Sequence, residues 1–287
     1  MNSDELRALV AQLLRERNET EPSQTPPTDD EGVLPDITAI DLRRQYLVEQ
    51  PQNAEAFLAL KAKTPARLGL GRAGARYKTA TMLRFRADHA AAQDSVFSMV
   101  REDFAAQNGF VPVQTRCRDK DEYLTRPDLG RRFDEEAQAV IRRTCAGQRV
   151  LLVIGDGLSS AAIEANAPDC AAAIRQGLQS YGIELGKSLF IRFCRVGASD
   201  QLGELTDCEL VCMLVGERPG LITNESMSAY LTYRPHIGIA ESKRTVVSNI
   251  HRQGVAAVEA GAHIAALIDK ILRQKASGVD LRQEVEA

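Results

Sequence analysis

The sequence contains no tryptophan, and aromatic residues make up only 5% of its 287 positions. Proteins that bind single-stranded nucleic acid stack its bases on aromatic side chains, so this composition argues against that class. A formal net charge of −3 also gives no bulk attraction to nucleic acid or to an anionic membrane surface. We therefore expect neither nucleic acid nor a membrane as a partner.

Long apolar segments and secretory features are missing as well. No run approaches the roughly 18 apolar residues that a membrane-spanning helix requires. The opening residues, MNSDELRALV, lack a basic region followed by an apolar core, so we expect no secretory signal and a cytoplasmic location.

The patterns of metal sites and disulfide frameworks are absent too. The four histidines never stand four residues apart, and no cysteine pair has the two-residue spacing of a zinc site. The six cysteines are spread along the chain, at Cys117, Cys145, Cys170, Cys194, Cys208 and Cys212. We expect buried free thiols in a reducing compartment, and no metal site.

Three short apolar segments between residues 150 and 220 carry the clearest structural signal. They are VLLVIGDGLSS, SLFIRFCRV and CELVCMLVGERPGL, and such uninterrupted apolar runs are typical of strands buried on both faces of a sheet. Two of them end in a Gly-acid pair, Gly155-Asp156 and Gly216-Glu217. An open α/β sheet binds its ligand at the carboxyl ends of its strands, so we expect a site on the loops around Asp156, Arg195-Val196 and Glu217.

The pattern divides the chain into four parts. Leucines at three- and four-residue steps predict an amphipathic helix over residues 1–18, and a proline-rich stretch predicts a flexible linker over 19–36. Residues 37–147 are expected to be mainly helical, and 148–287 to form an α/β domain with a mostly parallel sheet and helices on both faces. The expected strands are 150–154, 188–195, 210–215, 229–233 and 245–248, and the expected helices are 41–63 (broken near Pro51), 75–101, 128–145, 159–165, 170–181, 201–206 and 254–275.

A basic segment lies within the predicted helical part. Residues 67–86, RLGLGRAGARYKTATMLRFR, hold six basic side chains and no acidic one, and their glycines precede a helix. A glycine-rich basic loop at a helix amino end favours an anion or a partner. A solvated basic face or a subunit contact is the alternative.

Three common binding and catalytic motifs are incomplete or absent in this sequence. Gly155 and Gly157 follow a strand, but Ser160 stands where a dinucleotide fingerprint has its third glycine. A phosphate-binding Walker loop and a Gly-x-Ser-x-Gly nucleophile elbow are also absent. A hydrolase using Ser159 or Ser160 near Asp156 therefore remains a weak alternative.

Seven segments, in sequence order, closely resemble one enzyme family. They are GRAGARYKTATMLRFRADHA, YLTRPDLGRRF, IGDGLSS, DQLGE, LVGERPGL, VVSNIH and QKASGVDL. This series, within residues 66–281, is similar to the small subunit of ethanolamine ammonia-lyase. The resemblance implies a helical amino-terminal part, a Rossmann-like carboxyl-terminal domain and a hetero-oligomer with a large barrel subunit that holds the substrate. It also implies adenosylcobalamin, bound between the two chains, and conversion of ethanolamine to acetaldehyde and ammonia.

The resemblance also implies which residues contact the cofactor. The family motifs place its contacts at Val196, Glu217 and Val246, and relatives can have Cys at the last position. Asp156 and Arg195 are secondary candidates for cofactor amides or the nucleotide tail. No catalytic residue is expected on this chain, since the cofactor and the large subunit carry the reaction.

The family resemblance suggests a role for the amino-terminal helix. Family members occur inside ethanolamine-utilisation microcompartments, and the helix over residues 1–18 resembles peptides that load enzymes into such shells. A frayed terminal helix is the alternative. For the whole chain, the alternative from another class is a non-enzymatic corrinoid- or nucleotide-binding α/β module.

Overall fold

The computed structural model describes residues 36–282, and the chain divides into two units, residues 1–40 and 41–287. In the first unit the described part holds one 3-10 turn, Ile37–Ala39, and the Asp36 side chain caps it by accepting a hydrogen bond from the Thr38 N–H. The helix predicted for residues 1–18 and the linker predicted for 19–36, apart from Asp36, lie outside the described residues.

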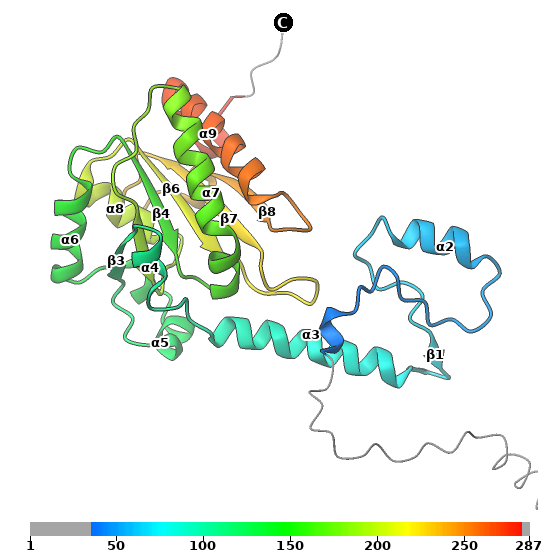
Figure 1. Cartoon of the computed structure of the whole chain (residues 1–287). Coiled ribbons are helices and arrows are strands. Elements are labelled where there is room, and N and C mark those ends of the chain that lie inside the picture. The colour runs from blue at the N-terminus through cyan, green and yellow to red at the C-terminus, as the bar shows by residue number, and fades with distance from the viewer. Residues whose placement is uncertain (1–35, 283–287) are drawn as a thin grey trace, which may run out of the picture. The chain divides into compact units, whose positions relative to one another are not determined.

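A mixed six-stranded sheet, in the order β3-β5-β4-β6-β7-β8, forms the centre of the second unit (Figure 1). Strands β3, β5, β4 and β6 are parallel, whereas β7 is antiparallel to β6 and β8 is antiparallel to β7. The strands are β3 (Val111–Gln114), β4 (Val150–Gly155), β5 (Leu189–Arg192), β6 (Leu210–Gly216), β7 (Met227–Tyr233) and β8 (Arg244–Ile250). The predicted α/β class is confirmed, with a mixed sheet.

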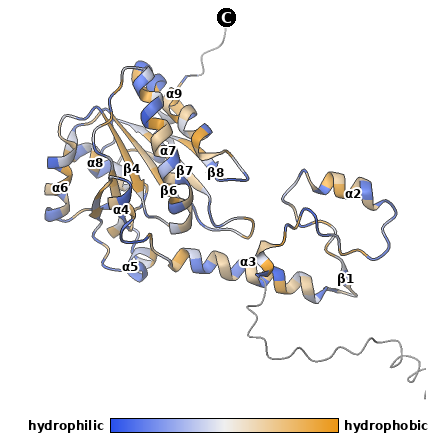
Figure 2. Ribbon diagram, in the orientation of Figure 1, coloured by the Kyte–Doolittle hydropathy of each residue, from blue (hydrophilic) through white to orange (hydrophobic). Residues whose placement is uncertain are grey.

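Helices cover both faces of the central strands. On one face the core side chains come from α7 (Ser160–Ser180) and α9 (Ala257–Gln274), and on the other from α6 (Glu135–Cys145) and α8 (Ala198–Thr206). Every residue of β4 and β6 is buried, because successive side chains alternate between two covered faces. Figure 2 shows these strands as apolar ribbons between helices with mixed colouring.

Side-chain caps determine where two of these helices begin. Ser159 accepts a hydrogen bond from Ala162 N at 3.0 Å at the start of α7, and Asp134 accepts one from Ala137 N at 2.8 Å at the start of α6. The sequence predicted a helix from residue 128, but Leu129–Arg131 forms a separate 3-10 turn before α6.

Helix α7 is continuous, although the sequence predicted two helices on either side of Pro168. Proline lacks the N–H that would bond to the preceding turn, which normally bends or breaks a helix. The packing of α7 compensates: Cys170 and Ile174 are fully buried, and a Cβ added to Gly261 of α9 would lie 2.7 Å from the Cys170 carbonyl oxygen. Burial against the sheet and α9 stabilises the helix across the proline.

The segment predicted as helical, residues 37–147, contributes less helix than expected and one strand of the main sheet. Its helices before α6 are α2 (Ala54–Lys61), α3 (Thr79–Phe97), α4 (Phe104–Gln107) and α5 (Lys120–Thr125), and β1 (Arg72–Ala73) and β2 (Arg76–Tyr77) form a small hairpin. Strand β3 was not predicted, because it is only four residues long and contains Pro112, which is tolerated at this edge of the sheet. None of the described helices is long and apolar enough to cross a membrane.

Candidate functional site

Both Gly-acid pairs lie at the carboxyl ends of buried strands, as the sequence predicted. Gly155 ends β4 and Gly216 ends β6, and the two strands are parallel neighbours. Glycine is required at the end of β6, because a Cβ on Gly216 would lie 2.0 Å from the Ser159 carbonyl oxygen at the start of α7. The close approach of α7 therefore leaves no room for a side chain at the position before Glu217.

The chain after β5 crosses the end of β4 to reach β6. The Cys194 Sγ lies 3.7 Å from the Met213 Sδ of β6, and a Cβ on Gly155 would lie 2.9 Å from the same Sγ. This crossing brings Val196 to the sheet face covered by α6 and α8, where it is partly buried beside a core that also contacts Tyr230 of β7.

Glu217 is held on the same face. Its carboxylate accepts hydrogen bonds from the hydroxyl of Ser226, at 2.8 Å, and from that of Ser228 on β7. Side chains two residues apart on a strand share a face, so Ser228 and Tyr230 both point to the side on which Glu217 lies. Burial raises the pKa of the Tyr230 hydroxyl, and the negative charges of Glu217 and Glu241 raise it further.

Val246 lies opposite Tyr230 in the β7–β8 ladder. Directly paired residues of antiparallel strands point to the same face, so Val246 stands beside Tyr230. Its side chain is 47% exposed, unlike the buried residues of β4 and β6. The structure thus places Val196, Glu217 and Val246 on the same sheet face as Tyr230, and we call these four residues the candidate face.

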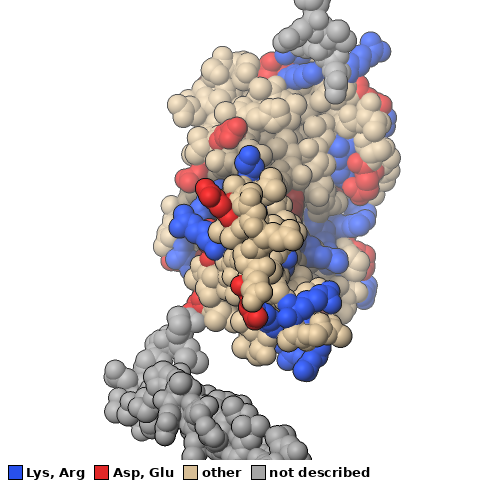
Figure 3. Space-filling view, turned by 90° about the vertical axis from the view of Figure 1, so that its right-hand side faces the viewer, with Lys and Arg blue, Asp and Glu red and all other residues tan. Residues whose placement is uncertain are grey.

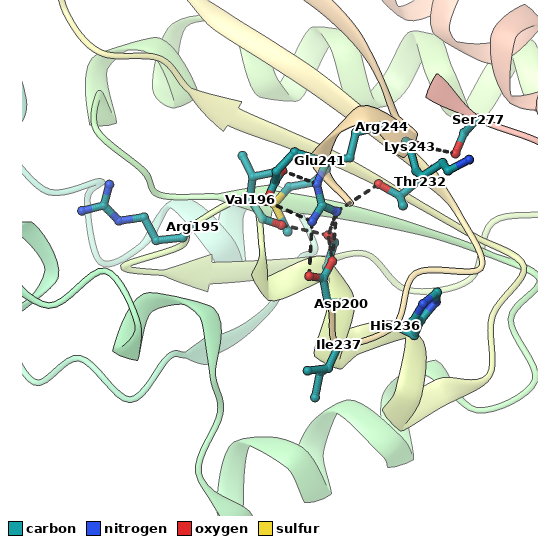
Figure 4. A network of polar contacts seen from close by, with 12 residues as sticks. Arg195, Val196, Asp200, Thr232, His236, Ile237, Glu241, Lys243, Arg244 and Ser277 are labelled. Carbon is teal, nitrogen blue, oxygen red and sulfur yellow. Dashed lines mark hydrogen bonds and ion pairs between the residues drawn. The ribbon is translucent and has the colours of Figure 1, made fainter. Parts of the chain in front are cut away.

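A buried arginine joins the two elements that carry the valines (Figure 4). Arg244 of β8, with a side chain only 2% exposed, forms ion pairs with Asp200 (2.9 Å) and Glu241 (2.6 Å) and donates a hydrogen bond to the Ser199 hydroxyl (3.0 Å). The Ser199 hydroxyl in turn donates to the Val196 carbonyl oxygen at 2.8 Å. The start of α8, with Val196, is therefore tied to β8, with Val246.

Asp156 does not join the candidate face. It is fully buried, and its carboxylate accepts from the Val100 N–H at 3.3 Å and lies 2.8 Å from the Ser160 hydroxyl. Burial raises its pKa, although the nearby Lys120 ammonium opposes that shift. Burial also lowers the pKa of Lys120, so desolvation dominates at both groups.

The Arg195 side chain points away from Val196, as Figure 4 shows. Its guanidinium carbon lies 4.2 Å from the centre of the Tyr123 ring, and its Nη2 donates to the Tyr123 carbonyl oxygen at 2.6 Å. Its Nε is buried without a hydrogen-bond partner among the described residues. In this conformation Arg195 supports the loop around Tyr123.

Ser159 and Ser160, the nucleophile candidates of the hydrolase alternative, are buried at the start of α7. The Ser159 hydroxyl donates to the Asn224 carbonyl oxygen, and the Ser160 hydroxyl lies 2.8 Å from the Ser98 carbonyl oxygen. A nucleophile has to reach its substrate, so this arrangement disfavours a serine hydrolase.

Half of the basic side chains in residues 67–86 are paired within the chain. Arg67 and Arg84 both form ion pairs with Asp88, at 2.7 and 2.9 Å, and Lys78 pairs with Glu49 at 2.6 Å. Figure 3 shows groups of Lys and Arg side chains on the face turned to the viewer, with acidic side chains between them. The anion or partner site in this segment stays a prediction.

The thiol prediction is confirmed. All six cysteines are free and buried, and burial raises the pKa of Cys145 to about 11 and that of Cys170 to about 12. Within residues 36–282 no group of three or more His, Cys, Asp or Glu side chains is arranged to hold a metal ion.

Comparison with known proteins identifies the family. Residues 54–282 match the model of the ethanolamine ammonia-lyase light chain (EutC). The chain belongs to the ethanolamine ammonia-lyase light-chain family. It is 58% identical over 293 residues to the ethanolamine ammonia-lyase small subunit of Clostridioides difficile, with 98% of this chain and all of that protein covered.

Two further relatives of this ethanolamine ammonia-lyase family are close in sequence. The chain is 55% identical over 296 residues to the small subunit of Clostridium perfringens, with 98% of this chain and all of that protein covered. It is 60% identical over 250 residues to the small subunit of Lachnoclostridium phytofermentans, with 87% of this chain and 84% of that protein covered. The resemblance inferred from the seven motifs is confirmed, and a small subunit implies a large one as partner.

Sequence reasoning missed Tyr230, Asp200 and Arg244. A weak signal was present for Arg244, since it stands two residues before Val246 and strand alternation places both on one face. Its contacts with α8 join residues 44 and 45 positions apart, and no local pattern encodes them.

Proposed function

We propose that this chain is the small subunit of an adenosylcobalamin-dependent lyase that converts ethanolamine to acetaldehyde and ammonia. In this proposal its Rossmann-like domain forms one side of the cofactor cleft, and the large subunit forms the other side and holds the substrate. Family membership supports the lyase assignment. The cofactor assignment rests on the candidate face.

The observation that carries the proposal is the placement of Val196, Glu217 and Val246 on the same sheet face as Tyr230. A corrin ring is a broad, partly apolar disc whose edge bears amide groups. A surface with an exposed valine and a half-buried tyrosine suits the disc, and a carboxylate suits an amide N–H as acceptor. The residues present therefore fit the cofactor.

The exposure of Val246 supports a cleft that is shared with a second chain. Ligand sites usually bury most of their ligand, but Val246 is 47% exposed in this chain. A second polypeptide is expected to enclose the ligand on the open side. Cobalamin in the family position then meets Val246 through packing, since valine offers no side-chain hydrogen-bond donor.

When bound, adenosylcobalamin supplies radical chemistry by homolysis of its cobalt–carbon bond. The residues of this chain would hold and orient the cofactor. Glu217, held by Ser226 and Ser228, would accept from a corrin amide, and the valines would keep water from the ring. The two serine hydroxyls keep the carboxylate in place before the ligand arrives.

Reconstitution tests the proposal. The purified chain, the large subunit and adenosylcobalamin are assayed singly and in combination for acetaldehyde and ammonia. Activity is expected only when all three are present. Corrinoid binding by this chain alone, with no turnover in the full mixture, would instead indicate a non-enzymatic corrinoid carrier.

A further inference from the structure

A cleft of about 600 Å³ opens beside the candidate face. Glu217, at the end of β6, lines both the cleft and the face. Other walls come from the loop after β6, from the chain that follows β8, including His251, and from the segment around Lys63. A ligand on the candidate face can therefore extend directly into this cleft.

The cleft is positively charged. Arg43, Lys63 and Arg218 line it, and none of these side chains forms an ion pair with a described carboxylate. Glu217 is the single carboxylate among the described residues that line it, and each of its oxygens accepts a hydrogen bond from a serine hydroxyl. Three cations around one cleft, none with an ion-pair partner among residues 36–282, favour a bound anion.

The neutral groups of the cleft also suit an anion. The Thr223 hydroxyl oxygen accepts a hydrogen bond from the Glu225 N–H at 3.1 Å, which leaves its proton for a ligand. His251 is buried, with Nε2 2.7 Å from the Asn249 Oδ1 and Nδ1 accepting from the Gln253 N–H. Burial lowers the pKa of His251, so the positive charge of the cleft comes from the arginines and the lysine.

We propose that this cleft binds a phosphate group. Arginine guanidinium groups match phosphate oxygens in pairs, and lysine adds a point charge. The proposal rests on the proposed function for its favoured source, which is the phosphodiester in the nucleotide tail of adenosylcobalamin. That tail hangs from the edge of the corrin ring, and Glu217 places a ring edge next to the cleft. A free phosphate is the other source of the same chemistry.

Two probes distinguish the nucleotide tail from the ring. Adenosylcobinamide carries the same corrin ring as adenosylcobalamin but lacks the phosphate, the ribose and the base. Dissociation constants of both probes are measured by absorbance titration of the complex of full-length chain and large subunit. The test variant is Lys63→Gln with Arg218→Gln, and the control is Arg142→Gln with Arg143→Gln, an equal charge change at exposed positions of α6.

The test variant should weaken adenosylcobalamin binding about tenfold or more, because it removes two charge-assisted hydrogen-bond donors from the phosphate site. Adenosylcobinamide binding should stay within about twofold, a difference under about 0.5 kcal/mol. The control should leave both constants unchanged. Equal weakening of both probes, or no weakening of either in a complex that binds adenosylcobalamin, would overturn the nucleotide-tail assignment.

Inorganic phosphate tests the cleft separately from the cofactor. Its binding to the full-length chain is followed by phosphorus NMR, with and without the two substitutions. Saturable binding that the test variant loses and the control keeps supports a phosphate site even if the wild-type complex fails to bind adenosylcobalamin, a failure that would overturn the proposed function alone. Without phosphate binding in this assay and without selective weakening in the corrinoid titration, the phosphate proposal is wrong.

Discussion

Val246 is the exposed valine of the candidate face. The other apolar strand residues that point to this side are covered by α6 and α8, whereas Val246 is 47% exposed at the β8 edge of the sheet. An exposed valine contributes little to the stability of the chain alone. Substitution there can separate binding from folding.

We expect Val246→Glu to weaken adenosylcobalamin binding to the two-chain complex by about tenfold or more, because the cofactor would desolvate an unpaired carboxylate. Stability to urea should change by less than about 0.5 kcal/mol. Val258→Glu on α9, where the valine is 60% exposed, makes the same chemical change away from the face and should leave binding unaltered. Unchanged binding by Val246→Glu would exclude Val246 from the contact.

The buried carboxyl group of Asp156 should make the stability of the folded chain depend on pH. Burial raises its pKa in the folded state, so folding favours the protonated carboxyl, and this contribution is lost as the pH rises through the folded pKa. Asp156→Asn cannot ionise. Its stability relative to wild type should therefore increase from about pH 4 to about pH 7, as measured by urea unfolding at each pH.

An exposed carboxylate provides the control for this measurement. Glu184→Gln, at an exposed position before β5, should show no comparable trend with pH. A slope of the opposite sign for Asp156→Asn would mean that attraction to Lys120 outweighs the cost of burial.

At the scale of elements, Arg244 joins β8 to α8. The guanidinium contacts Glu241 next to its own strand and Ser199 and Asp200 at the start of α8. One planar group with several fixed donors can satisfy all three, and lysine has no equivalent geometry. The relative placement of Val196 and Val246 therefore depends on this side chain.

We expect Arg244→Met to lower the free energy of unfolding by about 3 kcal/mol or more, because it leaves Asp200, 13% exposed, without its ion-pair partner. The cofactor should also bind more weakly to the folded variant. Arg149→Met is the matched control, since the Arg149–Glu209 pair is 52% and 32% exposed and should be worth less than about 1 kcal/mol. Equal losses in the two variants by urea unfolding would contradict the proposed role of Arg244.

Elements differ in how well local sequence predicts them. The strands β4 and β6 and the helix α9 were expected within a few residues, because long apolar or periodic runs specify them locally. Strand β3 and the continuity of α7 across Pro168 were not expected. Both depend on tertiary partners, β5 for the strand and α9 with the sheet for the helix.

At the scale of the whole molecule, membership of a small-subunit family implies a partner chain, and the predicted amino-terminal helix suggests a second association. We propose that residues 1–18 load the enzyme into a bacterial microcompartment. Deleting them should abolish co-fractionation with shell proteins and leave lyase activity of the assembled complex unchanged. Deleting residues 24–30 within the predicted linker is the control and should preserve loading, since a flexible tether tolerates a change of length. Unchanged loading without residues 1–18 would reject the role.

The sequence by itself determined the α/β class, the buried thiols, the Gly-acid pairs at strand ends and the family, because each depends on local pattern or on motifs. Only the tertiary structure decided which candidates meet. Val196, Glu217 and Val246 share one sheet face, and the antiparallel register of β7 and β8 places Tyr230 opposite Val246. Asp156 follows β4 in sequence, and Arg195 follows β5. Asp156 is nevertheless buried, and Arg195 contacts Tyr123 instead of the candidate face. The pairing register of the strands and the direction in which these side chains point depend on long-range packing, which no short stretch of sequence encodes.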